Sequence, residues 1–526
     1  MPDPCTDNLG YFFSDTAQRV PSHVAVVDLW GAQRREFSFA ELDRRANGVA
    51  AFFQAQGAMP GERIALLVGN RCEYIESFFG LMRAGLVSVP LNPKQAEANL
   101  EFMLRDSGAS GVILDIEACP LGAVVADRLG LRYRVILPAQ TPPANWESVL
   151  ANWQLYEAAF EHPAPVFTPR LSPDGIAFQP YTAGSTGKPK GVRLRHEGML
   201  WSIRSTEAKW PTSPDEVGLV CVPLFHKNAM RGTVKPNLFA GARTVLMPRY
   251  EPKEFLQTLA SERATYCGGV PAIFSMILQH QELISQLDFS ALKLLVIGSA
   301  VVPTELVRNL NRIFPNAKVK ESYGLTEGGG PLRGPVNGRI TPPGSAGIIA
   351  EGYEVKLVAV DGTHGAEEGE LWTRSPCVTD GYHNLPELTR ERIVDGWLRT
   401  GDLFRVDREG FYYFRGRVDD MFSCGGENIY PREVESLLLG HPDVTDACVV
   451  PVAHSVKGLV PAAMVVLRPG ALTNGEALKA YSLANGPAYA HPRRVLVVDS
   501  IPLGSAGKPD KGRIREALKL TEPGAQ

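Results

Sequence analysis

Short apolar runs alternate with segments of helical periodicity along most of the chain. The runs include RIALLVGN, LVSVPL and GVILD in the first part, and VGLVCVP, RTVLMP and LKLLVIGS further on. Between them stand segments whose apolar residues fall on one helical face. Continuous apolar strands separated by helices are typical of parallel sheets that are covered on both faces. The pattern therefore predicts two stacked α/β subdomains.

The clearest helix begins in the sequence FSFAEL. Ser38 and Glu41 form a capping box there, and apolar residues then recur on one face of the predicted helix. The recurring residues are Leu42, Ala46, Val49 and Phe53. Gly57 suits the end of this helix. Further helices are expected at 72–84 and at about 95–105.

Beyond a Gly- and Pro-rich stretch at 328–345, the predicted strands become shorter and more polar. YEVKLVAV, GELWTRS and GFYYFRGRVDDMF predict a small β-barrel-like part. A small α+β unit follows, with a helix that begins at Pro431. That helix is expected to bury Val434, Leu437 and Leu438. The predicted fold is α/β, with a large N-terminal domain at 1–418 and a small α+β C-terminal domain at 419–526.

Composition narrows the class of protein. The chain has 526 residues, 44% of them hydrophobic, and a formal net charge of -3, so no basic excess points to a nucleic-acid partner. No signal peptide is evident, and no apolar stretch reaches the ~18 residues that a membrane span needs. The eight cysteines form no CxxC pair and the ten histidines form no ligand-spaced cluster. We therefore expect a cytoplasmic protein without a structural zinc site.

The stretch YTAGSTGKPKGV, at 181–192, concentrates glycines, hydroxyl side chains and lysines. Glycines let backbone N–H groups approach an anion, while hydroxyls and lysines add donors and positive charge, so this composition favours phosphate binding. The spacing is not that of a nucleoside-triphosphatase P-loop, because two residues separate Gly184 from Gly187. Pro189, which follows Lys188, also opposes a direct continuation into a helix. An ordinary Gly/Ser turn with solvated lysines is the alternative.

Further motifs stand at the ends of predicted strands or in loops. YGLTE (323–327) ends one strand and GSA (298–300) ends another, and ligands gather at the carboxyl ends of strands in open α/β sheets. Asp402, in TGD, could accept both hydroxyls of a ribose, and Arg417 could brace the same sugar. Lys508 lies in the glycine-rich loop GSAGKPDK, from which it could reach a distant site. Each motif alone also fits a plain turn or an exposed surface charge.

Together and in this order, the motifs resemble those of the acyl-adenylate-forming superfamily. This superfamily includes acyl-CoA synthetases, the adenylation domains of peptide synthetases, and firefly luciferase. The resemblance covers nearly the whole chain, and SCGGENIYPREVE and HSVKGLVPAAMVVL look most like acyl-CoA synthetases. It implies an enzyme that uses ATP, Mg²⁺ and coenzyme A to activate a small carboxylic acid.

The resemblance also assigns roles in nucleotide binding. The residues that it implies for the phosphates are Thr182, Ser185, Thr186, Gly187, Lys188 and Lys190. Those that it implies for the adenine are Gly298, Ser299, Ala300, Glu321, Ser322, Tyr323 and Gly324. Asp402 and Arg417 would hold the ribose. Thr326 would touch the α-phosphate and Glu327 would bind Mg²⁺.

The implied reaction has two steps, first to acyl-AMP and pyrophosphate and then to acyl-CoA and AMP. The catalytic residues that the resemblance implies are Lys508, Thr326, Glu327 and His226. Lys508 would bridge the carboxylate and the α-phosphate in the first step. Rotation of the small domain about Asp419 would then replace it with a coenzyme A channel at Gly425, Gly426 and Tyr489.

The sequence restricts the acid only broadly. The acid-binding positions that the resemblance implies are His226, Lys227, Asn228, Gly268, Gly329 and Gly330. Their small residues favour a roomy pocket for an aromatic, polar-substituted or medium-chain acid. Lys227 would meet a second polar group of the acid or, alternatively, face the thiol channel or solvent. A carrier protein as the acyl acceptor and a non-catalytic acyl-AMP binder are the alternative functions.

Overall fold

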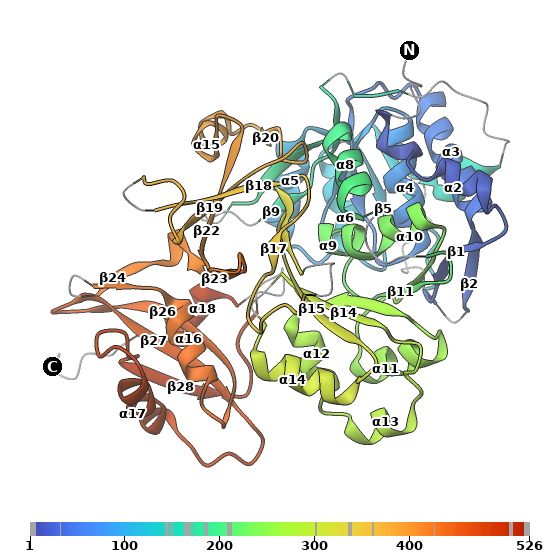
Figure 1. Cartoon of the computed structure of the whole chain (residues 1–526). Coiled ribbons are helices and arrows are strands. Elements are labelled where there is room, and N and C mark those ends of the chain that lie inside the picture. Colours follow the sequence, from blue (N-terminus) through green and yellow to red (C-terminus); the bar gives the residue numbers. More distant parts are fainter. Residues whose placement is uncertain are drawn as a thin grey trace. The chain divides into compact units, whose positions relative to one another are not determined.

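The computed structural model describes residues 7–519, apart from 32, 142–145, 147, 149–150, 162–169, 173, 183–187, 208–212, 300–301, 335–338, 360–361, 425–426 and 504–508. Figure 1 shows the chain coloured along its sequence. By its internal contacts the chain divides into two compact units. The first comprises Met1–Val355 and Thr373–Arg399, and the second comprises Lys356–Trp372 and Thr400–Gln526. The predicted boundary between residues 418 and 419 stays a prediction.

The first sheet of the larger unit has the strand order β20-β10-β8-β4-β3-β5-β6-β7. Its strands are β3 (Arg63–Leu67), β4 (Val87–Pro90), β5 (Ala109–Leu114), β6 (Tyr133–Ile136), β7 (Gln154–Leu155), β8 (Ile176–Phe178), β10 (Lys190–Arg195) and β20 (Gly381–Tyr382), with β9 (Tyr181–Thr182) beside β10. Strands β3 to β8 pair in parallel, whereas β10 is antiparallel to both β8 and β20. The parallel, buried strands are those that the continuous apolar runs predict.

The second sheet has the order β17-β16-β15-β14-β13-β11-β12-β1-β2. Its strands are β1 (Val24–Asp28), β2 (Arg35–Ser38), β11 (Val217–Val220), β12 (Arg243–Leu246), β13 (Tyr266–Gly269), β14 (Leu294–Gly298), β15 (Lys318–Leu325), β16 (Gly329–Arg333) and β17 (Ile348–Ile349). The central strands are parallel, and β2, β16 and β17 pair antiparallel at the two edges. Strand β1 comes from the N-terminus and pairs with β12.

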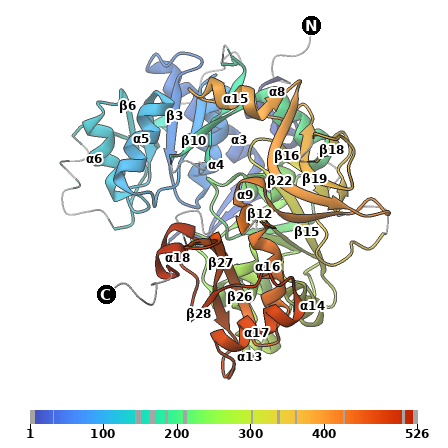
Figure 2. The same cartoon turned by 90° about the vertical axis from the view of Figure 1, so that its left-hand side faces the viewer.

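Helices accompany the strands of both sheets. They are α2 (Ser14–Arg19), α3 (Phe39–Ala55), α4 (Cys72–Arg83), α5 (Glu97–Ser107), α6 (Pro120–Arg128), α8 (His196–Ser202), α9 (Lys227–Ala229), α10 (Lys235–Ala240), α11 (Pro252–Ser261), α12 (Pro271–Ile277), α13 (Gln281–Gln286), α14 (Thr304–Ile313) and α15 (Pro386–Arg392). Figure 2 shows α5 and α6 together beside β6. Every residue of α4 is buried, and one apolar core joins residues of both sheets. The larger unit therefore has the two stacked α/β parts that the sequence predicts.

Helix α3 shows how the local sequence sets an element. The Ser38 hydroxyl accepts a hydrogen bond from the backbone N–H of Glu41 at 3.2 Å, which satisfies one free donor of the first turn. The residues predicted for its core face are all buried: Leu42, Ala46, Val49 and Phe53. The helix ends at Ala55, and Gly57 follows it with φ of 76°. The capping and packing predictions for this helix are confirmed.

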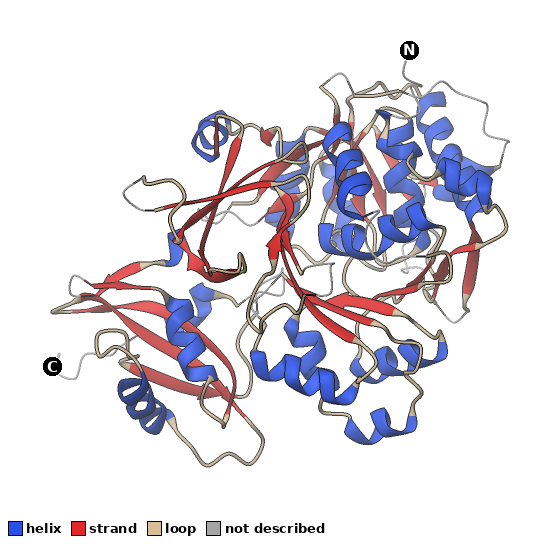
Figure 3. Ribbon diagram, in the orientation of Figure 1, coloured by secondary structure: helices blue, strands red, loops and turns tan. Residues whose placement is uncertain are grey.

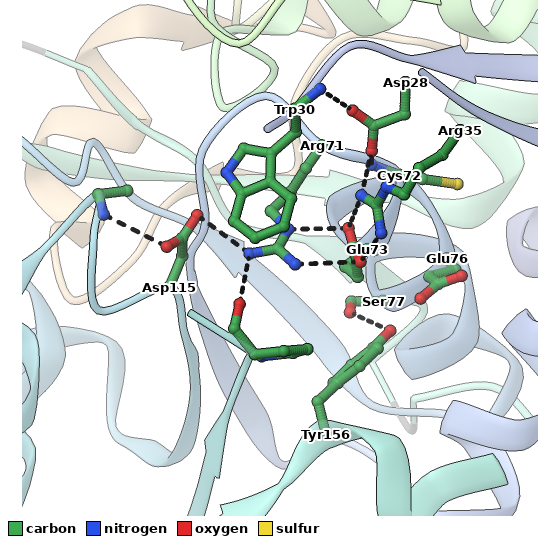
Figure 4. Close-up of polar contacts among 12 residues, drawn as sticks. Asp28, Trp30, Arg35, Arg71, Cys72, Glu73, Glu76, Ser77, Asp115 and Tyr156 are labelled. Atoms are coloured by element: carbon green, nitrogen blue, oxygen red, sulfur yellow. Dashed lines mark hydrogen bonds and ion pairs between the residues drawn. The ribbon is translucent and has the colours of Figure 1, made fainter. Parts of the chain in front are cut away.

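A buried ionic cluster lies at the start of α4 (Figure 4). The Arg71 guanidinium, fully buried, donates to the Glu73 carboxylate at 2.8 and 3.1 Å and stacks 3.6 Å from the centre of the Trp30 ring. Arg35 donates to the same carboxylate at 2.7 Å. Asp28, at the end of β1, accepts from the Cys72 N–H at 2.8 Å. The cluster thus connects β1 of the second sheet to α4, the helix that is buried in the core between the two sheets.

The smaller unit contains short strands and an α+β part. A further sheet, of order β18-β19-β22-β21 with β23 beside β22, is divided between the two units, because β21 lies in the larger unit, β23 lies in the smaller one, and the chain divides within β18, β19 and β22. Its strands are β18 (Glu354–Val358), β19 (Glu368–Arg374), β21 (Ile393–Val394), β22 (Trp397–Val406) and β23 (Tyr412–Arg417). The α+β part has β24 (Phe422–Cys424), β25 (Glu427–Ile429), β26 (Val444–His454), β27 (Gly458–Leu467), β28 (Arg494–Val498), α16 (Pro431–Leu439), α17 (Gly475–Asn485) and α18 (Lys511–Ala517).

Helix α16 begins at Pro431, as the sequence predicts, and packs against β26 (Figure 3). Val434 and Leu438 are buried, but Leu437 is only half-buried. The prediction for Leu437 is therefore wrong, because that side chain lies at the edge of the apolar face rather than at its centre. Among the described residues, no helix combines the length and apolar character that crossing a bilayer requires.

Candidate active site

The carboxyl ends of neighbouring strands in the second sheet bring several predicted residues together. Strand β14 ends at Gly298, whose partner on β15 is Ser322, and β13 carries Gly268 opposite Val296. Because β13, β14 and β15 run in parallel, their carboxyl ends meet at one edge, where open α/β sheets bind ligands. Of the residues predicted to frame an adenine, this edge contains Gly298, Ser299, Glu321, Ser322, Tyr323 and Gly324. Ala300 lies outside the described residues.

The end of β14 needs a glycine for a packing reason. A Cβ at Gly298 would stand 2.6 Å from the Ser322 hydroxyl oxygen and 2.7 Å from the Ser322 carbonyl oxygen. Ser299 then takes a left-handed conformation, with φ of 64°, and is exposed. Positive φ in a residue other than glycine stores strain and is found at ligand-binding turns. The backbone at Gly298, which we call the glycine ledge, has no Cβ and can therefore lie flat against a planar ring.

Glu321 is the ionisable group of this edge. Its carboxylate accepts a hydrogen bond from the Gly344 N–H at 3.1 Å. Burial raises the pKa of Glu321 to about 7, and that hydrogen bond offsets only part of the rise. Glu321 is therefore partly protonated near neutral pH.

The turn after β15 holds Thr326 and Glu327, and it is fixed from several sides. The Glu327 carboxylate accepts a hydrogen bond from the Tyr382 hydroxyl at 3.2 Å, and its carbonyl accepts from the Thr379 N–H at 2.6 Å. The Thr326 carbonyl accepts from the Lys227 ammonium at 2.9 Å. These contacts orient the Glu327 carboxylate and fix the main chain of Thr326 beside the end of β14. The sequence does not predict Tyr382, which lies in β20 of the other sheet.

Lys227 begins the short helix α9 and is followed by a π-helical turn, Met230–Val234. Burial lowers the pKa of Lys227 to about 8. The side chain is part-buried and donates to the main-chain carbonyl of Thr326. Contact of Lys227 with the acid, or with the thiol channel or solvent, stays a prediction. His226 caps α9, and its ring centroid lies 4.4 Å from that of Phe225.

The predicted acid-binding glycines differ in the room that they leave. A Cβ added at Gly268 would have the Val296 carbonyl oxygen as its nearest neighbour, at 3.8 Å, so space remains there. A Cβ added at Gly329 would lie 2.5 Å from the Tyr353 hydroxyl and 2.6 Å from the Cys377 sulfur. The space at Gly330 is taken by the guanidinium of Arg231. The sequence predicts a roomy pocket at all three glycines, but two of them are covered by larger side chains.

The two ends of the glycine-rich loop at 181–192 are paired with each other in a short antiparallel ladder. Thr182 on β9 pairs antiparallel with Lys190 on β10, so the chain leaves and returns at the same place. The Lys188 ammonium lies 5.8 Å from the centre of the Phe102 ring. Ser185, Thr186 and Gly187 lie outside the described residues. Thr182, Lys188 and Lys190 therefore stand at the two ends of one loop.

Asp402 and Arg417, in the smaller unit, face each other across β22 and β23. Arg417 Nη1 lies 2.8 Å from Asp402 Oδ1, and the Asp402 side chain is buried. Asp419 follows in a 3-10 turn, with its carboxylate 3.9 Å from Arg417 Nη2. The pair is thus an ordered charged group rather than two independent surface charges.

Lys508, Gly425 and Gly426 lie outside the described residues. The residues that flank the lysine loop, Leu503 and Pro509, form an antiparallel bridge. Tyr489 is 40% exposed.

The described residues include one carboxylate, that of Glu327, whose position suits a Mg²⁺ ion bound together with a nucleotide. Among them, no group of three or more histidine, cysteine or carboxylate side chains is assembled to hold a metal. Mg²⁺ in nucleotide sites usually binds through one or two carboxylates, substrate phosphates and water, so a single oriented carboxylate such as Glu327 suffices. Glu327 is the residue that would hold the ion.

Comparisons with known proteins identify the family of the chain. Residues 13–383 match the model of the AMP-binding enzyme family, and 433–508 match the AMP-binding enzyme C-terminal domain. A feruloyl-CoA synthase of Amycolatopsis sp is 34% identical over 94% of this chain and 96% of its own. A long-chain-fatty-acid–CoA ligase of Bacillus subtilis is 30% identical over 96% of this chain and 93% of its own.

A solved structure gives the same result at the level of the fold. The anthranilate CoA ligase AuaEII, in complex with anthranoyl-AMP, is similar with a TM-score of 0.86 and 25% identity, over 97% of each chain. The family match covers both parts of the chain, and the similar proteins named here are CoA ligases or synthetases. The chain therefore belongs to the family of AMP-binding enzymes and is related over nearly its full length to acyl-CoA ligases.

Proposed function

We propose that the protein is an ATP- and Mg²⁺-dependent carboxylate–CoA ligase. The observation that carries the proposal is the edge formed by β14 and β15, where the glycine ledge at Gly298 and the fixed turn at Thr326 and Glu327 belong to adjacent strands. Such an edge can hold a nucleotide base and its α-phosphate side by side. The relatives named as CoA ligases support the same reaction for this chain.

In the first step, a carboxylate oxygen of the acid attacks the α-phosphorus of ATP. A new P–O bond forms, the bond from that phosphorus to the β-phosphate breaks, and pyrophosphate leaves. Both reactants are anions, so the site must supply positive charge and hydrogen-bond donors. Lys188, Lys190 and Lys508 would supply the charge, and Thr326 would donate to the α-phosphate. Bound Mg²⁺, held by Glu327, would neutralise charge on the phosphates.

In the second step, the thiolate of coenzyme A attacks the acyl carbonyl carbon. The carbon–oxygen bond to AMP breaks and the thioester forms, with AMP as a leaving group far better than hydroxide. Asp402 and Arg417 would hold the ribose through both steps. Rotation about Asp419 would withdraw Lys508 and admit the thiol past Gly425, Gly426 and Tyr489.

We infer an aromatic, polar-substituted or medium-chain acid as the substrate. The open space beside Gly268 supports room for an acyl group, and the feruloyl and anthranoyl relatives support a substituted one. The test is AMP release from ATP with a panel of acids, with and without coenzyme A. We expect release that needs both the acid and coenzyme A. Turnover with an acylated carrier protein as the only product would instead show that a carrier is the acceptor.

A further inference from the structure

Arg231 is a charged side chain that the proposed mechanism does not use. It lies in the π-helical turn Met230–Val234, and such turns occur often at functional sites. Its guanidinium rests on the hairpin of β15 and β16. A Cβ at Gly330 would overlap Nη2, and a Cβ at Gly324 would stand 2.9 Å from Nη1. The guanidinium therefore lies where side chains of this hairpin would otherwise be, beside the Thr326–Glu327 turn.

Within the described part of the chain, this guanidinium has no carboxylate as a counter-charge. Its Nε is buried and has no hydrogen-bond partner, and no carboxylate in the described part of the chain forms an ion pair with Arg231. The Glu327 carboxylate accepts from Tyr382 instead. The hydroxyl of Tyr353, which lies nearby, is engaged with the Gly330 N–H at 3.1 Å and the Cys377 sulfur at 3.1 Å.

Two of the charged neighbours of Arg231 are cations, and the nearby carboxylates of Glu327 and Glu351 act on those two cations. Lys227 lies one helical turn before Arg231, and Arg333 lies at the end of β16; each interacts electrostatically with Arg231. An arginine cannot lose its proton to relieve this repulsion. Arg231 is half-buried, and a buried Nε–H without a partner is unfavourable, so the arrangement is explained if a ligand supplies the acceptor.

We propose that Arg231 binds the distal carboxylate of the substrate, and that the acid activated here is a short dicarboxylic acid. The inference rests on the proposed ligase function. A guanidinium can bind a carboxylate through two parallel N–H donors, one of which would be the unpartnered Nε–H. The Lys227 ammonium uses one of its three donors on the Thr326 carbonyl, so Arg231 is the cation whose buried donor has no partner within the described residues.

The test uses matched acids and acid-dependent exchange of labelled pyrophosphate into ATP, without coenzyme A. Adipate, its monomethyl ester and hexanoate share one chain length and differ only at the distal end. We expect the wild-type protein to use adipate at least about 100-fold better, in kcat/KM, than either of the others, as a charged hydrogen-bonded pair implies. Equal use of the three acids would overturn the proposal.

Two variants make the assignment specific. Arg231→Met should lower kcat/KM for adipate by about 100-fold and leave hexanoate unchanged or improved. Gly330→Ala should act in the same direction, because its methyl group displaces the flexible end of Arg231. Arg333→Met is the charge-matched control and should preserve the preference for adipate. If Arg231→Met does not fold, wild-type ranking and Gly330→Ala decide the question.

The outcomes separate the two proposals. Exchange with aromatic acids or monocarboxylic acids, without a preference for adipate, would overturn the role of Arg231 and leave the ligase function standing. A loss of the same size for adipate and hexanoate in Arg231→Met would also overturn it, because that result indicates a structural role. Absence of exchange with every acid would overturn the ligase function itself.

Discussion

Lys227 shows how one side chain can act on the site through the main chain. Its ammonium donates to the carbonyl of Thr326, the residue that we propose to contact the α-phosphate. We expect Lys227→Met to lower kcat for adenylation about 10-fold or more, because a hydrogen bond from a charged donor contributes about 1.5–3 kcal/mol. The KM for the acid should change little. Pyrophosphate exchange, measured over a range of acid concentrations, checks both values.

The same variant has a distinct pH signature. The Lys227 ammonium loses its proton as pH rises through its lowered pKa of about 8, so the wild-type rate should fall there. The Met variant should lack this decline. A variant with unchanged kcat and an altered ranking of acids would show instead that Lys227 contacts the acid. Lys293→Met, at an exposed lysine paired with Glu216, is the control.

Glu321 predicts a pH dependence of stability rather than of rate. Burial raises its folded-state pKa to about 7 from an ordinary value of 4.5, so the folded protein binds the proton more tightly than the unfolded chain. Stability must therefore decrease as pH rises from 4.5 towards 7 and stay at its reduced value above that. Glu321→Gln removes this penalty. Its Tm should exceed that of the wild type at about pH 8 by more than at about pH 5; equal differences would contradict the raised pKa.

Among the elements, the parallel strands β13 and β14 offer a matched pair of glycine substitutions. In Gly298→Ala the new methyl group would meet the main-chain oxygen of Ser322 at 2.7 Å, and backbone cannot move aside as a side chain can. We expect a loss of about 1–3 kcal/mol in the free energy of unfolding. Gly268→Ala, with its nearest neighbour at 3.8 Å, should cost far less. Denaturant unfolding of the two variants checks this; equal losses would show that strand spacing does not require Gly298.

The ionic cluster at the start of α4 supports a second prediction for an element. Burial opposes ionisation of Glu73, but hydrogen bonds from Arg71 and Arg35 outweigh it and hold its pKa well below its usual range. Its stabilising contribution is present above the ordinary pKa and is lost as pH falls through the lowered one. Glu73→Gln should destabilise the protein by about 3–5 kcal/mol, because it leaves buried cations without their partner.

Calorimetric or denaturant unfolding measures this loss. Glu101→Gln is the control, because Glu101 forms its ion pairs with Arg105 and Arg128 at the surface. That variant should unfold close to the wild type. A Glu73 variant as stable as the Glu101 variant would show that the cluster contributes little.

Local sequence patterns predicted several helices and strands correctly. They did not predict which distant segments pair with one another. The Ser38 cap and the apolar face of α3 are set by neighbouring residues, so both were readable. The pairing of β1 with β12 joins Val26 to Thr244, and no local pattern encodes such a contact. The same reason applies to the site. YGLTE marks a strand end, but the contact of Tyr382 with Glu327 depends on how the sheets pack.

At the scale of the whole molecule, the two units divide the proposed roles. The larger unit contains the glycine ledge, the Thr326–Glu327 turn and the base of the phosphate loop. The smaller unit contains Asp402, Arg417 and the loop that carries Lys508. In the proposed mechanism, rotation about Asp419 would move the segment that carries Lys508 relative to Asp402 and Arg417, so this movement would take place within the residues of the smaller unit.

The central claim is that the protein activates a carboxylate by joining it to AMP. Exchange of labelled pyrophosphate into ATP, measured without coenzyme A, tests this most directly, because exchange requires reversible formation of acyl-AMP. We predict exchange only when a substrate acid is present, and its loss in Lys508→Ala. Absence of exchange across a panel of aromatic, dicarboxylic and medium-chain acids, by a protein that still binds ATP, would contradict the claim.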